Sequence, residues 1–167
     1  MPQLRFKYQD ETGVFPKLKA AVNILCVAKG KDCLCTSGYR SLEKQKTINK
    51  QAASKPGRIQ REDGSVYDKK GTCWAAAYGK SNHNYGMALD IDDLWFKSLT
   101  NDELARYGLI KPMPHEPWHV ELIETRKITG DAKKVFYFLY THCLVADGIA
   151  GPKTRAKMAE LGVKSLC

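Results

Sequence analysis

The chain has 167 residues, of which 43% are apolar, and its formal net charge is +9. This size and composition support one globular domain with a small appendage, and they exclude a disordered tail or a long repeat array. No stretch approaches the roughly 18 consecutive apolar residues that a membrane-spanning helix needs, so we expect no stable insertion into a membrane.

Residues 1–13 carry charges of both signs and lack the apolar core of a secretory signal, so we expect the protein to be kept at first in a cytoplasm. The six cysteines include no Cys-x-x-Cys pair, which predicts free thiols. Residues 126–167 hold 8 basic against 3 acidic residues and are the most basic part of the chain. A basic surface attracts nucleic acid, anionic lipid and bacterial wall polymers alike, so charge alone does not choose among them.

The first half of the chain begins with regular elements. Apolar residues recur at three- and four-residue steps over 15–29, which predicts an amphipathic helix. A short strand is expected at 33–36 and a second helix at 41–53, capped by Ser41. Arg40 would then lie at a strand-to-helix corner, where a side chain is held rigidly and still exposed.

The middle of the chain is predicted to contain a long loop and two strands. Residues 54–80 are rich in Gly, Lys, Asp and Ser and are expected to form a loop or insertion. Residues 87–92 and 118–124 alternate between apolar and polar side chains, which is typical of half-buried strands. The alternation places Asp90 and His119 on the open faces, away from the apolar sides.

The sequence pattern at the end of the chain is typical of helices. A helix is expected near 131–143, a turn at 147–148, and a second helix at 152–161, where Pro begins and Gly ends the pattern. We therefore divide the chain into a main domain, residues 1–125, and a short helical segment, residues 126–167.

One apparent zinc motif fails on inspection. The string His115-Glu116-Pro117-Trp118-His119 has the letters of H-E-x-x-H, but that motif needs an uninterrupted helix to bring both imidazoles to one face. Pro112, Pro114 and Pro117 prevent such a helix. If His119 binds a metal ion, it does so from a strand edge with other partners.

His83, Asp90 and His119 offer a different ligand set. Two imidazoles and a carboxylate are a combination that zinc accepts, and a catalytic zinc keeps a fourth position open for water. Glu116, three residues before His119, could carry the proton of that water. Each residue alone has an ordinary explanation as a surface or satisfied side chain, and only the combination favours a metal site.

Three stretches together form a recognisable pattern: Ser37-Gly38-Tyr39-Arg40-Ser41 with Gln45, then Ser81-x-His83-x-x-Gly86-x-Ala88-x-Asp90, then Glu116-x-Trp118-His119. The pattern resembles the D-Ala-D-Ala and L-Ala-D-Glu peptidases of the lysostaphin and hedgehog-like zinc fold, over roughly residues 13–124. The runs 55–59 and 83–86 resemble in particular the phage and Bacillus L-alanyl-D-glutamate endopeptidases. An added stretch at about 61–74 departs from the pattern and leaves the shape of the substrate groove open.

The resemblance implies an α+β fold, with a small antiparallel sheet that carries the zinc, helices packed on one side, and a short helical segment at the C-terminus. It implies that His83, Asp90 and His119 bind Zn²⁺ and that Glu116 is the general base and acid. Arg40 would bind or polarise a substrate carbonyl or carboxylate. The remaining substrate contacts are expected from Ser81, Tyr85 and Trp118.

The expected function is hydrolysis of peptidoglycan stem peptides at L-alanyl-D-glutamate, by a monomeric phage endolysin that waits in the host cytoplasm until lysis and then acts on the wall. Two alternatives stay open: a D-Ala-D-Ala carboxypeptidase, and a zinc-binding or wall-binding module without catalysis. No motif for nucleic acid binding is present in the sequence. The run 147–154 is similar to the turn of a peptidoglycan-binding domain, although a helical pair packed on the catalytic domain would also explain the tail.

The sequence also supports predictions for four further side chains. We expect His115 to be exposed, with a supporting or substrate contact beside Glu116 as the alternative, and His142 to be structural. Asp92 or Asp93 is expected to orient one of the imidazoles.

Overall fold

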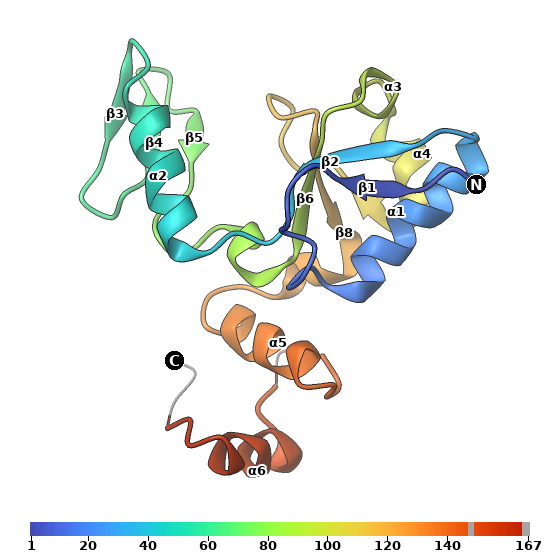
Figure 1. Cartoon of the computed structure of the whole chain (residues 1–167). Helices are drawn as coiled ribbons and strands as arrows, with labels where there is room; N and C mark the ends of the chain where they lie inside the picture. The colour runs from blue at the N-terminus through green and yellow to red at the C-terminus, as the bar shows by residue number, and fades with distance from the viewer. Residues whose placement is uncertain (147–148, 165–167) are drawn as a thin grey trace.

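A computed structural model of the chain describes residues 1–146 and 149–164 and shows a mixed α+β fold (Figure 1). The elements follow in chain order: β1 (Leu4–Phe6), α1 (Pro16–Lys29), β2 (Cys33–Ser37), α2 (Leu42–Ala53), β3 (Arg58–Gln60), β4 (Val66–Asp68), β5 (Cys73–Ala75), η1 (Asn82–Tyr85), β6 (Ala88–Ile91), α3 (Leu94–Lys97), α4 (Asn101–Ala105), β7 (Leu109–Ile110), β8 (His119–Leu122), η2 (Ile123–Lys127), α5 (Ala132–Thr141) and α6 (Pro152–Glu160). The predicted fold class is confirmed.

The main sheet has five strands in the order β1-β2-β6-β8-β7. The antiparallel pairing expected for this sheet is found between β2 and β6, β6 and β8, and β7 and β8, while the edge strand β1 pairs parallel with β2. The three residues of β1 are too few for an alternating pattern, and α1 supplies the crossover that a parallel pair needs. In the centre of the sheet, Asp90 lies directly opposite His119.

The hydrophobic core lies between this sheet and helices α1, α3 and α4. Helix α1 buries Leu18, Val22, Leu25 and Cys26 completely, which is the face that the sequence period predicts. The buried side chains of β6 and β8 in the same cluster are Leu89, Ile91, Val120 and Leu122. The predicted alternation is therefore confirmed, and it turns Asp90 and His119 to the opposite face of the sheet.

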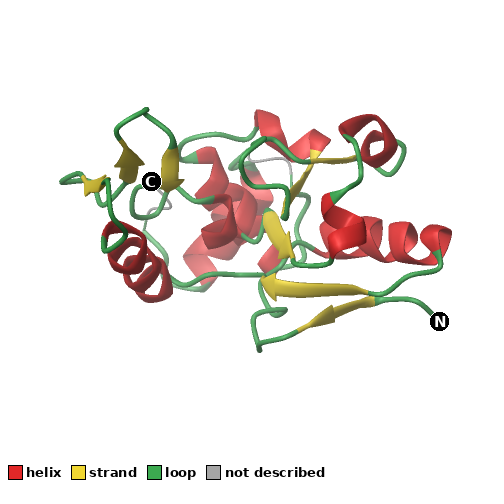
Figure 2. Cartoon of the chain, turned by 90° about the horizontal axis from the view of Figure 1, so that it is seen from above, coloured by secondary structure: helices red, strands yellow, loops and turns green. Residues whose placement is uncertain are grey.

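A second sheet, with strand order β3-β4-β5, stands beside α2 and apart from the main sheet (Figure 2). The long loop or insertion expected over 54–80 contains three strands, which were not predicted because strands of three residues leave no readable period. Asn49 of α2 is fully buried and fastens the lobe: its amide donates to the carbonyl oxygens of Gly64 at 2.7 Å and Ala76 at 2.8 Å. The added stretch 61–74 thus forms part of an ordered lobe.

Helix α5 of the tail packs on the catalytic part of the chain. Phe136 is buried with Met87 and Ile128, and the hydroxyl of Tyr140 donates to the carbonyl oxygens of Gly13 and Tyr85. Gly86 has a φ of 62°, and a Cβ there would collide with the Gly13 oxygen and the Tyr140 hydroxyl. Glycine at this position therefore permits both the left-handed turn and the close approach of α5.

The structure also bears on the predictions for the tail and the cysteines. The turn predicted at 147–148 lies outside the described residues, and so does Cys167. The other five cysteines are free thiols, as expected. The His142 ring stacks on Phe138 with centroids 4.2 Å apart, in agreement with a structural role. In the described ranges, no helix combines the length and the apolar character needed to cross a membrane.

Candidate metal centre

Three side chains from distant parts of the sequence meet beside the centre of the main sheet. Asp90 of β6 and His119 of β8 face each other across paired strands. His83 comes from η1, whose N-cap is Ser81; the Oγ atom of Ser81 accepts a hydrogen bond from the His83 amide. Together these residues form a group that could hold a metal ion, as the sequence predicts.

The spacing of the three ligand atoms fits a tetrahedral zinc ion. The Asp90 Oδ1 atom lies 3.2 Å from His83 Nε2 and 3.1 Å from His119 Nδ1, and the two imidazole nitrogens are 3.3 Å apart. Ligands about 2.0–2.2 Å from zinc in a tetrahedron lie about 3.3–3.6 Å from one another, close to the distances in this group. The donor set and its geometry therefore suit Zn²⁺, with one corner of the tetrahedron left for water or substrate.

Each imidazole is oriented by a hydrogen bond from its other nitrogen. His83 Nδ1 donates to the Gly38 carbonyl at 2.9 Å, and His119 Nε2 donates to Glu121 Oε1 at 2.9 Å. These bonds fix which nitrogen of each ring carries the proton and which one faces the metal position. His83 would therefore bind through Nε2 and His119 through Nδ1.

Glu121 is a functional residue that the sequence analysis missed. Its carboxylate is buried and accepts from His119, from Asn82 Nδ2 at 2.7 Å and from Arg126 Nη1 at 3.1 Å. The sequence does indicate that Glu121 lies beside His119, because residues two positions apart on a strand share one face of the sheet.

The expectation that Asp92 or Asp93 orients an imidazole was wrong. Asp92 pairs with Lys97, and Asp93 accepts from the Leu34 amide. Both acids follow β6 at the start of α3, where they serve local structure.

The electrostatics of the cluster favour a charged carboxylate and a protonated His119 when no metal is bound. Burial alone would raise the pKa of Asp90, but His83 and His119 outweigh it and hold that pKa well below its usual range. Burial opposes the charge of His119, yet hydrogen bonds to Asp90 and Glu121 raise its pKa to about 9. Burial lowers the pKa of His83 below its ordinary value despite Asp90. Binding of a metal ion must therefore displace the proton of His119.

Arg40 reaches the cluster from the corner before α2, as predicted, but its side chain is only 11% exposed. Its Nη2 atom donates to Ser37 Oγ at 3.0 Å and to Asp90 Oδ2 at 3.4 Å, and Nη1 donates to Gln45 Oε1 at 3.0 Å. The Nε atom is buried without a partner. Arg40 is thus held beside the metal position by fixed bonds and places positive charge at the outer oxygen of Asp90.

A cavity of about 380 Å³ opens on the three ligands. Arg40, Glu116, Ser81 and Trp118 line it, so the structure brings these four predicted site residues together with the ligands. Burial raises the pKa of Glu116, and the nearby His119 opposes this rise. Tyr85 lies elsewhere: its hydroxyl donates to the Gly79 carbonyl at 2.7 Å, and it does not line this cavity.

The small sheet forms one wall of the cavity through Trp74 and its neighbours on β5. The Trp74 indole donates to Asp68 Oδ2 at 3.0 Å, and the Arg58 guanidinium lies 4.1 Å from its ring centre. His115 is not freely exposed as expected, because its Nε2 atom lies 3.2 Å from the Cys73 oxygen and its ring meets Trp74 edge to face. The added lobe therefore reaches the loop that carries Glu116.

Comparison with known proteins gives one family match. The family model described as VanY, D-alanyl-D-alanine carboxypeptidase, matches residues 15–124, close to the extent of the resemblance in the sequence. No curated protein matches the chain.

Three solved structures are similar to the chain at low identity. The LdcB LD-carboxypeptidase, studied for peptidoglycan recognition, has 22% identity and a TM-score of 0.49, covering 87% of this chain and 73% of its own. A mutant of the vancomycin resistance D,D-pentapeptidase VanY in complex with Zn(II) has 23% identity and a TM-score of 0.45, covering 73% and 74%. VanYB in complex with D-alanine-D-alanine has 20% identity and a TM-score of 0.45, covering 91% and 84%.

Proposed function

The chain belongs to the VanY family of D-alanyl-D-alanine carboxypeptidases, and from this premise we propose that it is a zinc-dependent peptidase acting on the stem peptides of bacterial peptidoglycan. The observation that carries the proposal is the triangle of His83, Asp90 and His119, with edges of 3.1–3.3 Å, at the floor of a cavity that Glu116 also lines. A metal position with the half-buried carboxylate of Glu116 in the same cavity supplies the two groups that hydrolysis of an amide requires.

The chemistry divides among the residues of the cavity. A zinc ion held by the three ligands supplies a Lewis acid for the scissile carbonyl and lowers the pKa of water. Glu116 accepts the proton of the attacking water and passes it to the leaving amine. Arg40 places positive charge where the carbonyl oxygen becomes negative, or where a neighbouring carboxylate binds. Glu121 keeps His119 in the ring orientation that metal binding needs.

For the scissile bond we propose L-alanyl-D-glutamate. Support comes from the runs 55–59 and 83–86, which resemble the phage and Bacillus endopeptidases of that specificity. The second candidate is removal of a terminal D-alanine, and the description of the matching family supports it directly.

We also propose the biological setting of a monomeric endolysin that is held in the host cytoplasm until lysis and then degrades the wall. The same sequence runs support this setting. Expression in a bacterial cytoplasm should leave the cells intact until the inner membrane is permeabilised, and then lyse them. Lysis that needs no permeabilisation, or none after it, would count against the endolysin role.

The central experiment is digestion of purified peptidoglycan followed by mass spectrometry of the products. A new N-terminal D-glutamate supports the endopeptidase, and release of single D-alanine residues supports the carboxypeptidase. The Glu116→Gln variant should yield neither product while still binding zinc. The matched control is Glu124→Gln, whose exposed carboxylate pairs with Lys17 outside the cavity. A zinc-loaded wild-type chain that releases neither product would support the module without catalysis.

A further inference from the structure

Two lysines from distant parts of the chain meet at the metal cavity. Lys80 precedes η1, and Lys133 lies in the first turn of α5, and both side chains line the same cavity as the three metal ligands. The Nζ atom of Lys133 donates to the Lys80 carbonyl oxygen at 3.2 Å, which fixes the ammonium group next to Lys80. The tail helix thus contributes a positive charge to the candidate active site.

No carboxylate pairs with either lysine anywhere in residues 1–146 and 149–164. The three acids that line the cavity are committed elsewhere: Asp90 to the metal cluster, Glu121 to His119 and Arg126, and Glu116 to proton transfer. Asp131, at the start of α5, pairs with Lys134 at 3.0 Å. The charges of Asp131 and Glu121 act on Lys80 and Lys133 respectively, but neither acid forms an ion pair with these lysines in the described residues.

The position of Lys133 is electrostatically unfavourable in the chain alone. A cation in the first turn of a helix meets the positive end of the helix dipole. Burial lowers the pKa of Lys133, and the nearby charge of Lys80 lowers it further, while Glu121 opposes both effects. These costs are offset when an anion binds between the lysines, because the anion pairs with both charges and with the helix terminus.

We propose that Lys80 and Lys133 form a carboxylate-binding subsite of the active-site cavity, which recognises the free carboxylate of the stem peptide beside the scissile bond. This inference rests on the proposed function and names a specificity determinant for it. A D-glutamate residue inside a stem peptide uses one carboxyl group for the next amide bond and keeps the other free. A terminal D-alanine also has a free carboxylate, so both candidate substrates offer the required group.

Arg40 has fewer free donors for a substrate carboxylate than the two lysines. Its guanidinium is bound to Ser37, Gln45 and Asp90, whereas in residues 1–146 and 149–164 Lys133 Nζ donates to the Lys80 carbonyl oxygen and neither lysine pairs with a carboxylate. A substrate carboxylate can therefore pair with the lysines while Arg40 stays on the metal side of the cavity. The consequence is that α5 takes part in substrate selection, whether or not the tail also binds the wall.

The test measures binding rather than turnover. Zinc-loaded full-length Glu116→Gln protein is titrated by calorimetry with the stem peptide L-alanyl-D-glutamyl-L-lysine and with the same peptide carrying an amide in place of the free glutamate carboxyl. We expect the acid to bind at least about tenfold more tightly than the amide. Adding Lys80→Gln or Lys133→Gln should weaken binding of the acid by about tenfold and leave the amide within about twofold. Lys133→Arg should keep most of the preference, since it keeps the charge.

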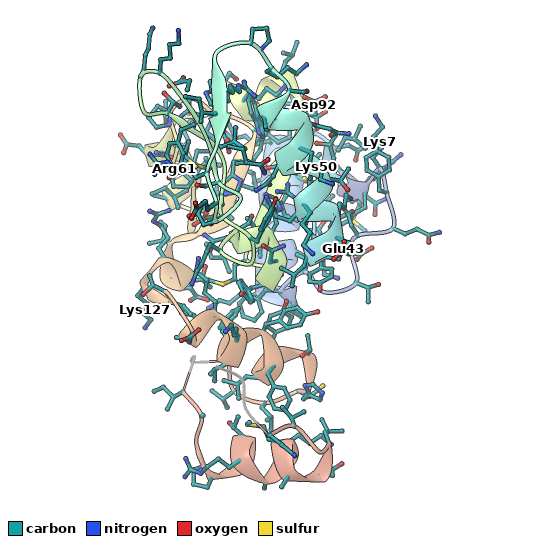
Figure 3. The ribbon with its side chains drawn as sticks, turned by 90° about the vertical axis from the view of Figure 1, so that its left-hand side faces the viewer. Lys7, Glu43, Lys50, Arg61, Asp92 and Lys127 are labelled. Carbon is teal, nitrogen blue, oxygen red and sulfur yellow. The ribbon has the colours of Figure 1, made fainter. Side chains whose placement is uncertain are left out.

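Lys127→Gln provides the matched control. Lys127 is labelled in Figure 3 where the chain enters the tail; it is exposed, and its removal lowers the net charge equally without touching the metal cavity. It should leave the preference for the acid unchanged. Thermal unfolding of every variant shows whether the fold is kept.

The outcomes separate this inference from the proposed function. A second pair of probes, a peptide ending in D-alanyl-D-alanine and its C-terminal amide, is titrated in parallel, so the result does not depend on which bond is cleaved. A preference for the acid that depends on the lysines supports the subsite even if wall digestion yields neither product. No preference for the acid in either pair, or a preference that survives both lysine substitutions, overturns it.

Discussion

Replacement of Glu121 by glutamine tests how His119 is held for metal binding. The carboxylate accepts from His119 Nε2, from Asn82 and from Arg126. A glutamine side chain keeps one oxygen for His119 and Asn82, but it loses the negative charge and presents an amide group to Arg126. The ring of His119 can stay in place, while its Nδ1 atom becomes a weaker ligand.

The size of the effect should depend on pH. Loss of such a supporting hydrogen bond costs about 10–100-fold in metal affinity, or about 1.4–2.7 kcal/mol, once proton competition is removed. Glu121 also helps to raise the pKa of His119 to about 9, so below that pH zinc must displace a proton. The wild-type affinity should therefore rise by about one log unit per pH unit toward 9. Because the variant holds this proton less tightly, the two affinity curves should converge as the pH falls.

Competition with a zinc chelator, at several pH values between 6 and 9, measures both curves. Glu124→Gln, which makes the same change on an exposed side chain that pairs with Lys17, should follow the wild type. A Glu121→Gln protein that is folded and binds zinc as tightly as the wild type at pH 9 would refute the reasoning. So would a constant loss at every pH.

Three further predictions concern the base, the turn and the lobe. Burial raises the pKa of Glu116, and a general base must be deprotonated to accept a proton. We therefore expect kcat/KM to fall as the pH drops through a value above the usual pKa of a glutamate. A pH profile whose acid limb lies at or below that usual pKa would contradict this. Gly86→Ala should destabilise the chain by about 2–5 kcal/mol in urea unfolding, from left-handed strain and displaced hydrogen bonds of Tyr140; an unchanged midpoint would show that the turn relaxes freely. Asn49→Ala removes a fully buried amide with three hydrogen bonds and should lower the free energy of unfolding by about 2–5 kcal/mol. The backbone amides of the β3-β4-β5 lobe should also lose protection in hydrogen exchange. Unchanged protection would mean that other contacts hold the lobe in place.

The sequence predicted that His83, Asp90 and His119 come together, because their positions depend on local rules. A period of two along β6 and β8 places Asp90 and His119 away from the apolar core, and the motif around His83 adds the third ligand. Periodicity does not tell what covers the polar face of a strand. The expectation that these side chains lie on open faces was wrong: His83 and Arg40 close over them, and the side chain of His119 is only 6% exposed.

The parts that the sequence did not predict depend on contacts between distant residues. The three-residue strands of the lobe are defined by their pairing and by the bonds of Asn49, which no local pattern reveals. Parallel pairing of β1 follows from the path of α1 across the sheet. The meeting of Lys80 with Lys133 requires α5 to dock on the catalytic part of the chain, over a separation of 53 residues.

Anomalous diffraction at the zinc absorption edge, from crystals of the zinc-loaded chain, tests the central claim most directly. We predict one strong peak about 2.0–2.2 Å from His83 Nε2, Asp90 Oδ1 and His119 Nδ1. A peak at any other group of side chains, or coordination of His119 through Nε2 instead of Nδ1, would contradict the account.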